Sequence, residues 1–271
     1  MKKQFIKLAA MSLAAVMSIG MLAGCGTTND TNTDDKLLSE TPEATDGVLI
    51  MGTNAAFPPF EFTTTDGLLG EFDGIDVAIA LEIAKSVNKE LQIEDMEFDG
   101  LLGAVQTGKV DMVVAGMTAD DERRKSVDFS DTYYTASQVM VVAADNEDIN
   151  SAEDLKNDKK VGVVIGYTGD TIVTETLAID EANITRANRG IDIVQDVKNG
   201  KLDAVVIDSA TGKALAEKTG LKVVEDSEVF DTEEYAIAVA KGNTELLESI
   251  NKVLAELKEN GTIAELAEKY N

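Results

Sequence analysis

Arg123 is placed where its side chain could bind a small anion. It is one of four arginines in the chain, and it follows the segment Ala115-Gly116-Met117-Thr118 by about one helical turn of sequence. A guanidinium beside backbone N–H groups and a threonine hydroxyl suits a carboxylate, which it can hold through two parallel hydrogen bonds. The alternative is that Arg123 pairs, on a wet surface, with the preceding acids Asp120-Asp121-Glu122.

Asp208 is a second charged residue that could bind a ligand, because it follows the mostly apolar run 202–207. Its carboxylate could receive an ammonium group, or it could cap the helix that follows. Asp208 and Arg123 on opposite sides of one cleft would complement the two charges of an α-amino acid. Phe57 and Phe98 are then candidate walls for the ligand side chain, although aromatic residues are also common in plain core.

Composition excludes several kinds of chemistry. The 271 residues contain no histidine, no tryptophan and one cysteine, Cys25. Catalysis by histidine, His-ligated or Cys-rich metal sites and a disulfide within the chain are therefore excluded, and no cofactor is implied. The formal net charge is −26. Nucleic acid is not expected as a partner, because phosphate contacts need clustered Lys and Arg.

The elements that position these residues alternate between β-rich and helical patterns. Strands are expected at 48–53, 110–116, 137–144, 161–165, 202–207 and 235–240. Helices are expected at 75–89, at 101–106, after a capping signature at 151–154, and over the last stretch, where residues 246, 250, 253 and 257 share one face. This alternation predicts an α/β fold with mostly parallel sheets.

A weak internal repeat suggests two similar lobes. The run Gly108-Lys109-Val110-Asp111-Met112-Val113-Val114 resembles Gly200-Lys201-Leu202-Asp203-Ala204-Val205-Val206. Chance similarity of two β-rich segments is the alternative. Ligands of open α/β sheets bind at the carboxyl ends of strands. A real repeat therefore predicts one cleft lined by Asn54, Gly116, Thr168 and Asp208.

Several further runs together resemble one known family. They are residues 52–61, 72–78, 98–102, 108–111, 117–118 with 122–124, and 127–130 with 133–134. The chain resembles the family 3 solute-binding proteins of amino acid ABC importers, such as the histidine, lysine/arginine/ornithine and glutamine receptors, over nearly all of 48–271.

The resemblance implies a two-lobed fold of the periplasmic-binding-protein type (type II). The chain is expected to cross twice between the lobes, near 135–139 and 232–236. Lobe 1 is then expected to comprise 48–137 plus 235–271, and lobe 2 to comprise 138–234. The implied function is binding of a free amino acid with hinge closure, without catalysis, by a monomer that delivers the ligand to a membrane permease.

The resemblance also implies residue roles. Arg123 and the backbone N–H of Thr118 are expected to hold the α-carboxylate. The Gly116 carbonyl, the Thr118 hydroxyl and Asp208 would take the α-ammonium, with Thr168 adding a bond from the second lobe. The other residues expected at the ligand are Asn54, Phe57, Phe98, Ala115 and Val164.

Departures from the family pattern bear on the ligand side chain. Asn54 stands where receptors for cationic side chains commonly have aspartate, and an amide can bond a neutral polar or a charged side chain. Val164 and Ile207 occupy positions that can be polar in the glutamine receptor. Tyr167 stands where threonine is frequent and is expected to narrow the cleft. Glutamine, arginine, lysine and histidine therefore all stay open.

The N-terminal residues predict export and anchoring. Lys2, Lys3 and Lys7 precede the apolar stretch 8–22, which is too short for a comfortable membrane span. The run Leu22-Ala23-Gly24-Cys25 resembles the lipobox of bacterial lipoproteins. This implies a signal peptide at 1–24 and an acylated Cys25 that anchors the protein in the lipid bilayer, on the outer face of the cell membrane. A signal peptide with a stray cysteine is the alternative. Residues 25–47 would then be a lipidated cysteine and a disordered tether.

Two other functions remain as alternatives. The same fold hosts cyclohexadienyl dehydratases, which need a positioned general acid in the cleft. The sequence places no unassigned carboxylate there. A ligand-presenting sensory receptor is the other alternative; a signalling domain would have to be supplied by another protein, since the last residues, 261–271, read as a polar helix.

Overall fold

The computed structural model describes residues 47–270. The predicted signal peptide at 1–24, the predicted acylation of Cys25 and almost all of the predicted tether lie outside the described residues. Within the described residues, no helix is both long and apolar enough to cross a membrane.

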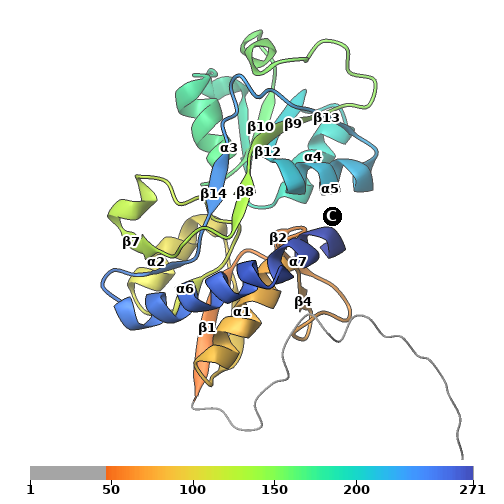
Figure 1. The fold of residues 1–271 in the computed structure, drawn as a ribbon. Helices are drawn as coiled ribbons and strands as arrows, with labels where there is room; N and C mark the ends of the chain where they lie inside the picture. The colour runs from red at the N-terminus through yellow and green to blue at the C-terminus, as the bar shows by residue number, and fades with distance from the viewer. Residues whose placement is uncertain (1–46, 271) are drawn as a thin grey trace, which may run out of the picture. The chain divides into compact units, whose positions relative to one another are not determined.

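The first of two five-stranded sheets has the strand order β5-β1-β6-β15-β7 (Figure 1). Its strands are β1 (Val48–Thr53), β5 (Glu90–Asp95), β6 (Met112–Val113), β7 (Val127–Phe129) and β15 (Ala238–Ala240). The helices with it are α1 (Ile75–Ser86), α2 (Leu101–Gln106), α6 (Thr244–Glu259) and α7 (Thr262–Tyr270). Helix α2 packs on β1, β6 and β15, whereas α1 packs against β5, α6 and α7.

The second sheet has the order β11-β10-β12-β9-β13. Its strands are β9 (Gln138–Val142), β10 (Val161–Val164), β11 (Ile184–Ala187), β12 (Ala204–Asp208) and β13 (Lys222–Val224). Its helices are α3 (Thr168–Thr171), α4 (Gly190–Lys198) and α5 (Ser209–Thr219). Short 3-10 and π turns complete the described chain: η2 (Phe98–Gly100), η3 (Arg123–Lys125), η4 (Ala152–Lys156), η5 (Ile172–Thr176) and η6 (Glu181–Asn183).

Two antiparallel strands, β8 (Tyr134–Ala136) and β14 (Glu233–Tyr235), carry the chain between the sheets and lie side by side (Figure 1). A third small sheet, β2-β3-β4, is formed by β2 (Ala56–Phe57), β3 (Glu61–Thr63) and β4 (Phe72–Asp73). The chain therefore passes from the first sheet to the second along β8 and returns along β14.

The internal repeat has the same structural role in both halves. Gly108 and Gly200 each take a positive φ in the turn that precedes the central strand. Asp111 accepts a hydrogen bond from the backbone N–H of Ile50 at 2.8 Å, and Asp203 accepts one from Lys160 at 2.7 Å. In each half the aspartate thus ties the turn to the neighbouring parallel strand, as expected for two related βαβ units.

Three expectations about the elements need correction. The sheets are mixed, because β15 runs antiparallel to β6 and β7, and β9 runs antiparallel to β12 and β13. The strand expected at 110–116 ends at Val113, since Gly116 turns the backbone away. The strand expected at 235–240 is split into β14 and β15, because the returning chain leaves the crossing before it enters the first sheet.

The helices bury the faces that their patterns indicate. On α6, the buried residues Ile250, Val253, Leu254 and Leu257 recur at helical spacing, whereas Leu246 is half-buried. The signature at 151–154 forms a capping box, in which Ser151 and Asp154 satisfy each other's backbone N–H groups, but it begins the 3-10 turn η4 rather than a longer helix.

Candidate functional site

The Gly116 turn forms one wall of the site. Gly116 has φ +50°, and a Cβ placed on it would lie 2.4 Å from the Phe57 ring, so that only glycine fits. Its N–H donates to Asp76 Oδ2 at 2.7 Å, and the Tyr133 hydroxyl donates to the same oxygen at 2.8 Å. The buried carboxyl at the start of α1 therefore holds the turn in place.

Arg123 is directed into the molecule and not onto a wet surface, since its side chain is 12% exposed. Its Nη1 donates to the Thr118 carbonyl at 2.8 Å, and its Nη2 donates to the Gly166 carbonyl at 3.0 Å. Asp120 Oδ2 lies 3.4 Å from Nε. The ion pair with a preceding acid, which was part of the alternative interpretation, is therefore also present. Burial lowers the pKa of Arg123, and the guanidinium still carries its charge at neutral pH. Arg123 is therefore a half-buried cation that contacts both halves of the molecule.

Asp208 stands at the N-cap position of α5 but makes no capping hydrogen bond. Its Oδ1 instead accepts from the Tyr235 hydroxyl at 2.5 Å, and the residue is 4% exposed. Burial, and then the charge of Glu233, raise the pKa of Asp208 to about 7. The carboxylate is therefore costly to ionise until a cation reaches it.

A chain of hydroxyls links the two halves beside these charges. Thr118 Oγ1 donates to Glu233 Oε2 at 2.7 Å, and Thr168 Oγ1 donates to Thr118 Oγ1 at 3.2 Å. The Thr118 hydroxyl donates its only hydrogen to Glu233 and accepts from Thr168, so one lone pair of its oxygen can accept from a further donor. That hydrogen bonding suits an ammonium group.

Glu233 and Tyr235 are two residues of the site that the sequence analysis missed. Glu233 is 9% exposed on β14, and Tyr235 on the same face of that strand is fully buried. The two-residue period of a strand is the signal that could have found Glu233, because it places this acid on the same face as the aromatic Tyr235.

Beyond these polar groups lies a compartment bounded by Asn54, Phe57 and Phe98. We call it the side-chain compartment, because the side chain of a ligand held by the polar groups would lie there. Asn54 Nδ2 donates to the Met96 carbonyl at 2.9 Å, which fixes the amide so that Oδ1 is the atom accepting from the Tyr167 hydroxyl at 3.1 Å. The Arg123 guanidinium carbon lies 5.4 Å from the centre of the Phe98 ring, within the range of a cation–π contact.

A cavity of about 10 Å³ remains where these groups meet. It is lined by Phe57, Phe98, Gly116, Arg123, Tyr167, Thr168 and Asp208. The structure therefore brings together six of the ligand residues expected from sequence, namely Phe57, Phe98, Gly116, Arg123, Thr168 and Asp208. Asn54 and Thr118 are hydrogen-bonded to residues of this group. Ala115 and Val164 are buried in the core and do not line the cavity.

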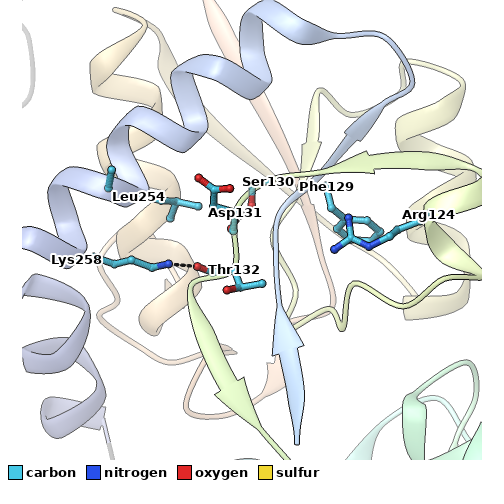
Figure 2. Close-up of a pocket in the computed structure, with 8 residues that line it drawn as sticks. Arg124, Phe129, Ser130, Asp131, Thr132, Leu254 and Lys258 are labelled. Atoms are coloured by element: carbon cyan, nitrogen blue, oxygen red, sulfur yellow. Dashed lines mark hydrogen bonds between the residues drawn. The ribbon is translucent and has the colours of Figure 1, made fainter.

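A second, larger pocket of about 490 Å³ lies between helix α6 and the segment 124–132, beside the first sheet (Figure 2). Its lining residues are Arg124, Phe129, Ser130, Asp131, Thr132, Leu254, Ala255 and Lys258. Lys258 already donates to the Thr132 carbonyl, and Arg124 lies over the Phe129 ring. Because both of its cations already have partners in the protein and its one aromatic ring is covered by Arg124, its volume alone does not make it the better ligand site.

A pair of buried carboxyls supports the site from behind. Glu61 is fully buried, and Asp76 is the neighbouring carboxyl that acts most strongly on it. Burial, and then the charge of Asp76, raise the pKa of Glu61 well above its usual value. Burial also raises the pKa of Asp76, to about 6. Burial and the neighbouring Asp76 therefore both favour the neutral form of Glu61.

Glu61→Gln is expected to stabilise the protein at pH 7.5 more than at pH 4.5. Because the pKa of Glu61 is higher in the folded state than its usual value of 4.5, the wild type loses stability as pH rises from that point. A neutral amide removes this loss. Urea unfolding at pH 4.5 and 7.5 measures it: the gain should be confined to the higher pH, and an equal gain at both would contradict the assignment.

The comparisons place the chain in a family. The profile of the bacterial extracellular solute-binding proteins, family 3, matches residues 49–271. The chain belongs to this family. Its two-lobed type II α/β fold, as expected from the sequence, is shared with solved structures of amino acid-binding proteins.

Three relatives illustrate the range of the family. The chain is 31% identical to the L-cystine-binding protein TcyJ of Escherichia coli (strain K12), over 97% of this chain and 96% of that protein. It is 35% identical to the arginine-binding extracellular protein ArtP of Bacillus subtilis (strain 168), over 82% and 85%. A solved structure of an ancestral arginine-binding protein bound to glutamine is 42% identical, with a TM-score of 0.75, over 83% of this chain and 97% of that one.

Proposed function

We propose that this protein is the receptor of an amino acid ABC importer, which binds a free polar amino acid between its two lobes and delivers it to a membrane permease. Relatives named for binding cystine, arginine and histidine support the general role. The acylation of Cys25 as anchor to the outer face of the membrane belongs to the same proposal and rests on the lipobox resemblance alone.

One observation carries the proposal: a half-buried cation, Arg123, and a buried acid, Asp208, line the same small cavity. Arg123 would hold the α-carboxylate, and Asp208 with the Thr118 oxygen would take the α-ammonium. Since these groups come from both halves of the chain, a ligand that contacts all of them favours the closed arrangement of the lobes.

The orientation of Asn54 narrows the ligand class. Its Oδ1 accepts a hydrogen bond in the side-chain compartment, and one of the two N–H groups of Nδ2 donates to the Met96 carbonyl. A ligand side chain that ends in a donor therefore suits the compartment. Arginine, lysine, glutamine and histidine carry such donors, and we propose that the ligand is one of the first three.

A thermal-shift screen of the purified protein against the common amino acids tests this function. A ligand at a hundredfold excess over its dissociation constant stabilises the folded state by about 2.7 kcal/mol, which raises the unfolding temperature by several degrees. We expect a shift with one or two members of the proposed set. A flat response to every amino acid would refute the proposal.

One observation favours a second candidate, a dehydratase of the cyclohexadienyl type. Glu233 lies beside the cavity, so a carboxyl that could serve as general acid is present after all. Its Oε2 already accepts from Thr118, however, and this argues for a supporting role. Incubation with prephenate or arogenate decides the matter: we expect no aromatised product, and product formation that is lost in Glu233→Gln would establish the enzyme.

A further inference from the structure

Tyr167 lies inside the side-chain compartment. Its hydroxyl donates to Asn54 Oδ1 at 3.1 Å, and its ring meets Phe57 edge-on, with centroids 5.3 Å apart at 90°. The Phe98 centroid is 4.6 Å away, and Tyr167 is 4% exposed. Tyr167 thus makes the aromatic contacts and the donor contact that the compartment would offer to a ligand side chain.

The residues on either side of Tyr167 occupy the polar half of the site. The Gly166 carbonyl accepts from Arg123 Nη2, where a ligand carboxylate would compete for the same donor. Thr168 donates to Thr118. Gly166 has φ +77°, and a Cβ on it would lie 3.3 Å from Asp99 Cβ, so glycine allows this close approach of the second half of the chain to the first.

We propose that Tyr167 is a specificity-determining residue, whose side chain competes with the side chain of the ligand for Asn54, Phe57 and Phe98. This inference rests on the proposed function and deepens it. The cavity of about 10 Å³ has room for roughly one water molecule. Every amino acid therefore needs the lining residues to move, and a long side chain needs in addition the space that Tyr167 fills.

This competition acts on long side chains more than on short ones. A ligand that needs a minor conformation binds with an affinity reduced by the fraction of protein in that conformation. Glycine and alanine carry no side chain that would take the place of Tyr167 at Asn54, so they need only the opening that every ligand needs. Arginine and glutamine reach Asn54, and the contacts of Tyr167 must be broken before theirs form. Tyr167 thus selects for side chains whose own contacts outweigh those of a phenol.

Titration calorimetry with glycine, alanine, glutamine and arginine on two variants tests the proposal. Tyr167→Ala should tighten binding of arginine and glutamine by about tenfold or more and change alanine by less than about twofold. Tyr167→Phe, which loses only one hydrogen bond, should tighten the same two ligands by a few-fold. Equal changes for all four amino acids, or weaker binding of the long ones, would overturn the proposal.

Tyr270→Phe is the matched control, because it removes a tyrosine hydroxyl that donates to Asp73 at 2.5 Å outside the cavity. Its affinities should equal those of the wild type. If the wild type binds an amino acid but the size-dependent gain is missing, only the inference about Tyr167 fails. If neither the wild type nor any variant binds an amino acid, the proposed function fails with it. Binding that appears only in Tyr167→Ala supports the competition.

Discussion

Arg123→Ala is expected to weaken binding of the preferred amino acid by about 3–5 kcal/mol, which is roughly two to three and a half orders of magnitude in the dissociation constant. Among the described residues that line the cavity, Arg123 is the only cation. Its loss leaves the ligand carboxylate desolvated and without a partner, and this unpaired charge accounts for the size of the effect. Titration calorimetry measures the change directly.

Arg124→Ala is the matched control, since Arg124 is the next residue along the chain. Its guanidinium lies over the Phe129 ring and faces the other pocket, and its Nε donates to the Ala119 carbonyl (Figure 2). Its removal should change the dissociation constant by less than about twofold. Unchanged affinity in Arg123→Ala, in a variant that unfolds at its normal temperature, would remove the carboxylate-binding role from the proposal.

Much of the fold could be predicted from local sequence signals. Helix α2 begins and ends at Leu101 and Gln106 as expected, and the buried face of α6 follows the apolar spacing closely. The sheets were harder, because the pairing of β15 with β6 joins residues more than a hundred positions apart. Periodicity indicates that a segment is a strand, but it carries no information on which strand lies beside it or in which direction it runs.

The candidate site divides in the same way. Arg123 and Asp208 stand out in sequence because charges are conspicuous beside apolar strand ends. The partners that set their chemistry do not stand out. Tyr235 meets Asp208 across 27 residues of sequence, and Glu233 meets Thr118 across 115. The raised pKa of Asp208 is created by this burial and by a neighbouring acid, so it arises only when the chain has folded.

The affinity for a zwitterionic amino acid is expected to rise with pH from 5 to about 7 and to level off above it. Before binding, Asp208 has a pKa of about 7, since burial and Glu233 disfavour its charge. An ammonium group within hydrogen-bond distance favours the carboxylate and lowers that pKa. Binding below pH 7 must therefore expel a proton, and the association constant should fall by up to tenfold for each unit of pH.

Calorimetry with glutamine or arginine at pH 5, 6, 7 and 7.5, in two buffers of different ionisation enthalpy, measures the affinity and the number of protons released on binding. At pH 5.5–6 about one proton should leave for each ligand bound, and the affinity at pH 5 should be about ten- to a hundredfold below that at pH 7.5. Asp208→Asn should bind the ligand more weakly at pH 7.5, and its affinity should no longer depend on pH between 5 and 7. Asp196→Asn changes a residue of α4 and breaks its ion pair with Lys201, so this variant should keep the pH dependence of the affinity. If the affinity of Asp208→Asn still rises with pH, the released proton comes from another group. Glu233 is then the first acid to test, because its charge raises the pKa of Asp208.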